Sequence, residues 1–180
     1  MVSKATVINI EGITDFISSV AFLDHTQIPE LVLSIIPVYK QFFENNTDQA
    51  INLVNFDFMC NICGMDLFNG KKSKIDSTNN TVKKFVGIIP DKKLASVIST
   101  SNVHEWHAIK YIMYLIYCFD KRKYTVIIES IDQDQLSDKV TNSWDQSHEI
   151  SLIFRFLATA NTSIAKDFLS INKDKVVVCE

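Results

Sequence analysis

Five short stretches of the chain carry the hydrophobic pattern of β-strands. They are rich in β-branched and aromatic residues, and apolar and polar positions alternate as they do in a half-buried strand. The predicted strands are 5–10, 51–59, 81–89, 124–131 and 174–180. For the second of them an alternative stays open, because Thr47 could cap a short helix there.

Other stretches repeat their apolar residues at helical spacing. The predicted helices are 14–25, 26–46, 91–99, 103–119 and 147–170, the last interrupted near 161–163. Pro29 falls in a first turn, where its missing N–H does little harm. Pro37 is instead expected to kink its helix or split it in two, with Ser34 available to cap the second piece.

The stretch 103–119 is apolar almost all round beyond Trp106, so we expect one central, buried helix there. Asn102 is its predicted cap, with Glu105 as the reciprocal partner. Strands interleaved with helices indicate an α/β or α+β class. At 180 residues, we expect a single layered domain over 1–180 with about five strands.

Composition and charge narrow the environment of the protein. Hydrophobic residues make up 47% of the chain and charged residues 22%, the balance of a globular protein. The net charge is -3, which does not draw the whole molecule to nucleic acid or an acidic membrane. The most apolar run, 108–119, contains Lys110 and is much shorter than the ~20 residues that cross a bilayer. Because Met1–Lys4 does not begin a signal peptide, we expect a cytoplasmic protein without a membrane partner.

Several classes of enzyme lack their sequence signature. The chain has four glycines, and they do not cluster as a phosphate loop or a dinucleotide-binding fingerprint requires. There is also no G-x-S-x-G turn that would present a nucleophilic serine. Catalysis is therefore not favoured.

One stretch, FMCNICGMDLFNG at 58–70, has the character of a chemical site. Cys60 and Cys63 have the spacing of a zinc half-site. Two further ligands are available at His104 and His107, which would share one face of a helix. These four residues are our candidate structural zinc site. The alternative is that both cysteines are small buried hydrophobes and both histidines are ordinary first-turn residues.

Other chemistry at the same residues is disfavoured. A redox pair needs a cysteine at a helix N-terminus, and Cys63 leads into a turn. A zinc protease needs His-Glu-x-x-His, but Ala108 stands four residues after His104. The deaminase signature has the opposite order. Cys118 cannot replace a ligand beside His107, because eleven residues of helix separate them by about 16 Å.

Two clusters of cations and an aromatic stripe are candidate contact surfaces. The first cluster, a candidate nucleic-acid or anion contact, consists of Lys71, Lys72, Lys74, Lys83 and Lys84. The second is Lys121–Lys123. The simpler interpretation is a solvated loop for the first and a helix C-terminus, where cations are favoured, for the second. Trp106, Tyr111 and Tyr114 are core residues in the simplest interpretation, and anchors for a protein partner if they are exposed.

These features favour a small intracellular protein that binds another protein and is not a catalyst, with zinc as its one candidate cofactor. Toxin antidotes, other inhibitor or immunity proteins and virus-encoded accessory proteins have this general composition. One alternative is a nucleic-acid-binding accessory protein that uses the Lys71–Lys84 loop. The other is a metal-dependent hydrolase, which would need an open coordination position.

Overall fold

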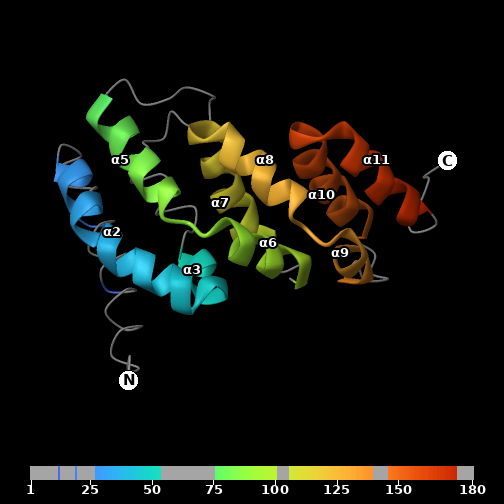
Figure 1. Cartoon of the computed structure of the whole chain (residues 1–180), viewed down its shortest axis with the longest axis horizontal. Coiled ribbons are helices and arrows are strands. Elements are labelled where there is room, and N and C mark those ends of the chain that lie inside the picture. Colours follow the sequence, from blue (N-terminus) through green and yellow to red (C-terminus); the bar gives the residue numbers. More distant parts are fainter. Residues whose placement is uncertain are drawn as a thin grey trace. The chain divides into compact units, whose positions relative to one another are not determined.

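The computed structural model describes residues 12, 19, 27–53, 76–100, 106–139 and 146–173, and for some helical residues the backbone alone. Every regular element in these residues is a helix (Figure 1). The predicted α/β or α+β layers with about five strands are therefore wrong for the described part of the chain. The predicted strands 5–10 and 174–180 lie outside the described residues.

The helices follow one another with short connections. They are α2 (Ile28–Asn45), α3 (Thr47–Leu53), α5 (Asp76–Gly87), α6 (Asp91–Thr100), α7 (Trp106–Phe119), α8 (Lys121–Glu129), α9 (Gln133–Lys139), α10 (Gln146–Ala160) and α11 (Thr162–Ile171). The helices predicted at 26–46 and 91–99 are confirmed, and so is the part of 103–119 that is described. The predicted helix 14–25 lies outside the described residues apart from Ser19.

The interruption predicted near 161–163 is also confirmed. Asn161 lies between α10 and α11 in an extended conformation. Its side-chain oxygen accepts hydrogen bonds from the backbone N–H of Ser163 at 3.0 Å and of Ile164 at 3.4 Å. An asparagine N-cap satisfies donors that the first turn of a helix leaves open, so α11 begins where the sequence supplies this cap.

Two of the predicted strands are helices because their burial follows a helical period. In a strand, Val82 and Lys84 would share one face, yet Val82 is buried and Lys84 is exposed. The same conflict holds for Val126, which is 41% exposed, and Ile128, which is 1% exposed. The buried positions of α8 are Tyr124, Ile127 and Ile128, a spacing that fits one helical face. Burial of one amphipathic face has therefore overridden the strand preference of the β-branched residues.

The beginning of the third predicted strand, 51–59, is also helical. Residues 51–53 are the last turn of α3, which begins at Thr47. The Thr47 hydroxyl donates to the Phe43 carbonyl at 2.6 Å and is buried. The short helix that stayed open as an alternative at this place is thus the one that forms, and 54–59 lie outside the described residues.

Pro37 does not split α2, which runs unbroken from Ile28 to Asn45. Ser34 does not cap a second helix, because its hydroxyl donates back to the Leu31 carbonyl at 2.7 Å. Pro29 lies in the first turn as expected. One face of α2 is buried on both sides of the proline, at Val32, Ile35, Tyr39, Phe42 and Phe43, and this packing holds the helix together across the missing hydrogen bond.

The chain forms two compact units. Unit 1 contains Met1–Pro90 and Ala108–Asp120, and unit 2 contains Asp91–His107 and Lys121–Glu180. The chain therefore passes from one unit to the other after Pro90, after His107 and after Asp120. Because each unit is assembled from separate segments of sequence, the organisation as a single domain over 1–180 stays a prediction.

In unit 1, α2 packs against α5 and α3. An aromatic cluster joins α2 to α5, with the Phe85 ring 5.4 Å from that of Tyr39 and 6.2 Å from that of Phe43. Both pairs meet edge to face, the arrangement favoured by the ring quadrupoles. All three side chains are fully buried. This cluster forms the centre of the described core of unit 1.

In unit 2, five helices pack in a closed circuit. Helix α6 contacts α8 and α9, α8 contacts α10, α10 contacts α11, and α11 contacts α9. Polar contacts reinforce the circuit, among them a hydrogen bond of 2.9 Å from the Tyr124 hydroxyl to the Phe156 carbonyl, which joins α8 to α10. The enclosed side chains are apolar, chiefly Leu94, Ile98, Ile127, Leu136, Leu157 and Phe168.

Candidate functional site

Helix α7 has two distinct faces within unit 1. One is fully buried, at Ile109, Ile112, Met113, Leu115, Ile116 and Phe119. The other is half-buried and consists of Lys110, Tyr111, Tyr114, Tyr117 and Cys118, which we call the tyrosine face. The expectation that this helix is buried on all sides is wrong. Its sequence is apolar almost all round because tyrosine supplies a second face that combines an aromatic body with a polar tip.

The tyrosine face is ordered by contacts along the helix. The Lys110 ammonium lies 4.9 Å from the centroid of the Tyr111 ring, within the range of a cation–π interaction. The side chains of Tyr114 and Cys118, one turn apart, form a hydrogen bond. Desolvation raises the pKa of Tyr114 above its ordinary value, and Cys118 raises this pKa further through charge and hydrogen bonding. The phenol therefore stays protonated at physiological pH and keeps a hydrogen-bond donor.

Of the three predicted anchors, the structure brings two together. Tyr111 and Tyr114 lie on the tyrosine face, while Trp106 is the first residue of α7 and its side chain is not among those described. The prediction missed Lys110 as part of this surface and left Tyr117 and Cys118 in the core. The spacing of three and four residues that links these positions to Tyr114 carried that information.

The candidate zinc ligands are almost entirely outside the described residues. Cys60, Cys63 and His104 are not described, and His107 is the second residue of α7 with only its backbone described. Within the described part of the chain, no group of three or more histidine, cysteine or acidic residues could hold a metal ion. The zinc site thus remains a prediction.

The cations of the predicted nucleic-acid contact are divided in the same way. Lys83 and Lys84 lie on the exposed side of α5, and Lys84 is in its last turn, where a cation is favoured by the helix dipole. Lys71, Lys72 and Lys74 lie outside the described residues. The contact through this loop therefore stays a prediction.

The acidic stretch 129–138 has a structural role at one position. The Asp132 carboxylate accepts a hydrogen bond from the backbone N–H of Gln135 at 3.0 Å, so it caps the start of α9. The backbone N–H of Asp132 donates to Ser99 Oγ at 2.9 Å, which fixes this turn against α6. These contacts explain one carboxylate of the stretch without any catalytic function.

Comparison with known proteins adds no relative. No protein-family profile, curated protein or solved structure matches the chain. Among the described helices, none combines the length and the apolarity that crossing a bilayer requires. The cytoplasmic location stays a prediction.

Proposed function

We propose that this chain is a non-catalytic protein-binding protein and that the tyrosine face of α7 is a contact surface for its partner. The observation that carries the proposal is the half-burial of three tyrosines on one helical face, opposite a face that is fully buried. The buried face anchors α7 in unit 1, so the tyrosines are presented on a fixed helix.

The chemistry of the face supports a protein partner. Tyrosine offers a large rigid contact area at a small cost in conformational entropy, and its hydroxyl can pair across an interface. Buried tyrosine and tryptophan anchors also carry a disproportionate share of interface energy. The intramolecular contacts of Lys110 and Cys118 with neighbouring tyrosines reduce the freedom that binding must remove.

The test compares three forms of the full chain as bait in extracts of cells that express it. The first is the native chain, the second carries Tyr111→Ser, Tyr114→Ser and Tyr117→Ser, and the third carries Leu33→Ser. Leu33 is a matched control, because it is an exposed apolar residue of unit 1 on another helix, with 38% of its surface accessible.

A partner of the tyrosine face is captured by the native chain and by Leu33→Ser but lost from the triple variant. Its affinity is then measured with purified proteins, where loss of the three side chains is expected to weaken binding by about 100-fold or more. Circular dichroism checks that the triple variant is folded. A folded triple variant that retains every specific partner would refute the proposal.

A further inference from the structure

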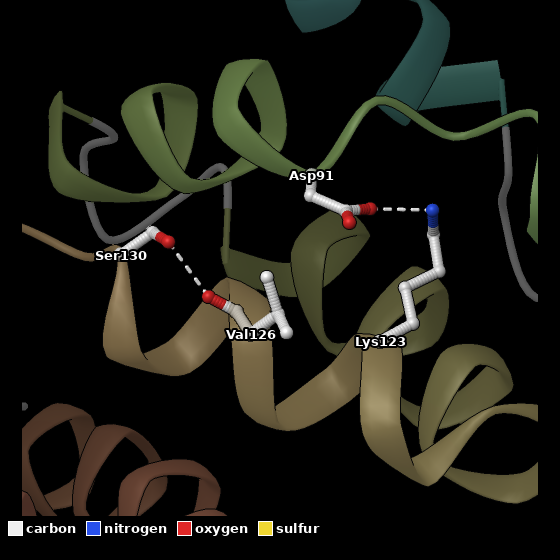
Figure 2. Close-up of polar contacts among 4 residues, drawn as sticks. All are labelled: Asp91, Lys123, Val126 and Ser130. Atoms are coloured by element: carbon white, nitrogen blue, oxygen red, sulfur yellow. Dashed lines mark hydrogen bonds and ion pairs between the residues drawn. The ribbon is translucent and has the colours of Figure 1, made fainter.

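Helices α6 and α8 of unit 2 lie side by side and run in the same direction (Figure 2). Asp91, the first residue of α6, forms an ion pair with Lys123 in the first turn of α8. At the opposite ends, the backbone N–H of Asp132, just beyond α8, donates to Ser99 Oγ near the end of α6. Contacts from start to start and from end to end therefore bring the first turns of the two helices together.

This arrangement gathers four exposed cations into what we call the cationic patch. It consists of Lys92, Lys93, Lys121 and Arg122. Each lies within two residues of the Asp91–Lys123 ion pair, whose Lys123 side chain is only 11% exposed. The segments 91–93 and 121–123 together hold five cations and one carboxylate, and Asp120 directly precedes the second segment.

The stability of the helices does not explain the patch. Lys121 is the first residue of α8, so Lys121–Lys123 are in its first turn, and the interpretation of these residues as a helix C-terminus is wrong. Cations are disfavoured at the positive end of a helix dipole, and here two such ends lie next to each other. Asp91 neutralises only part of this charge. A cluster that costs folding energy on an exposed surface is typical of a binding surface.

We infer that the cationic patch docks an acidic segment of a protein partner. The support is charge complementarity over a compact area, since the ammonium groups of Lys92, Lys93 and Lys121 are exposed point charges beside the guanidinium of Arg122. A long phosphate backbone fits less well, because exposed Glu129, Asp132 and Asp134 follow at the other end of α8 and beyond it. A short acidic stretch meets the cations without reaching those carboxylates.

The inference rests on the proposed function, because it states the charge of the partner, but it concerns a different surface. The tyrosine face belongs to unit 1 and the cationic patch to unit 2. Substitution of the three tyrosines is therefore expected to leave the binding of an acidic peptide unchanged, so the two proposals can fail separately.

The test measures the fluorescence anisotropy of a labelled oligoglutamate peptide with the full chain at low salt. The patch variant carries Lys92→Gln, Lys93→Gln, Lys121→Gln and Arg122→Gln. The control variant carries Lys40→Gln, Arg155→Gln, Lys166→Gln and Lys173→Gln, four exposed cations that lie elsewhere. Each variant removes four positive charges, so both change the net charge from -3 to -7 and any difference between them reflects position.

We expect the patch variant to bind the peptide about tenfold or more weakly, and the control variant to bind within about threefold of the native chain. Thermal melting checks the fold, and the double variant Lys92→Gln with Lys93→Gln is expected to lose an intermediate amount. Equal losses in the patch and control variants would overturn the inference, as would a native chain that does not bind the peptide. Tighter binding of single-stranded DNA than of the peptide would also overturn it, in favour of a nucleic-acid surface.

Discussion

The side-chain amide of Asn172 donates a hydrogen bond of 2.9 Å to the hydroxyl oxygen of Ser137, which lies 35 residues earlier in the chain. Asn172 is fully buried, Ser137 is 3% exposed, and the same amide nitrogen also donates to the Phe168 carbonyl. The contact therefore joins the end of α11 to α9 inside unit 2. Because each buried polar group depends on the other for a hydrogen bond, this pair is a specific point at which the circuit of helices closes.

Replacing Asn172 with alanine is expected to lower the free energy of unfolding by about 1–3 kcal/mol, since Ser137 and the Phe168 carbonyl each lose a buried donor. Urea denaturation monitored by circular dichroism measures the change. The control is Ser170→Ala, two residues away on the exposed side of α11, with an expected change below about 0.5 kcal/mol. Equal effects of the two substitutions would show that the buried contact contributes little.

Val126 distinguishes a helix from a strand at 124–131. This residue is in the middle of α8 with 41% of its surface exposed, so its effect on stability comes mainly from backbone preference. We expect Val126→Ala to preserve or raise the free energy of unfolding and Val126→Gly to be about 1 kcal/mol less stable than the alanine variant. A strand would instead be weakened by alanine relative to valine. Denaturation curves of the three proteins give the comparison, and a clear loss for Val126→Ala would argue against the helix.

The raised pKa of Tyr114 makes stability depend on alkaline pH. The folded chain holds the Tyr114 proton more tightly than the unfolded chain, whose tyrosine pKa is about 10. This contribution to stability is fully present below pH ~10 and is lost as the pH rises through the folded pKa. We expect Tyr114→Phe to show a smaller loss of stability than the native chain over that range. Cys118→Ser is expected to have an intermediate effect, because burial, the larger cause of the shift, remains.

The zinc hypothesis is tested by metal analysis of protein purified without a histidine tag. If Cys60, Cys63, His104 and His107 form a closed site, the native chain carries one zinc ion, and Cys60→Ser loses the metal and melts at a lower temperature. The matched control is Cys118→Ser, which replaces a half-buried cysteine of α7 and is expected to keep the zinc. A native chain without metal, with a Cys60→Ser variant that melts at the same temperature, would show that these cysteines are simple thiols.

Local signals explain which parts of the fold could be predicted. Asn161 supplies a cap to the backbone that immediately follows it, and the break between α10 and α11 occurs there. The apolar residues of 26–46 repeat over enough turns to identify a helix despite Pro37. In 81–89 and 124–131, by contrast, a short run of β-branched residues fits either a strand or one side of a helix. Only packing against neighbouring helices selects between them.

The sequence by itself determined the positions of the long amphipathic helices, the break at Asn161 and the presence of tyrosines and cations along the chain, because these depend on neighbouring residues. Tertiary structure decided which tyrosines of α7 are fully buried and which are partly exposed. It also brought Asp91 next to Lys123 and Ser137 next to Asn172. Such pairs are separated by more than thirty residues. Their meeting depends on how whole helices share one core, and no local pattern encodes that arrangement.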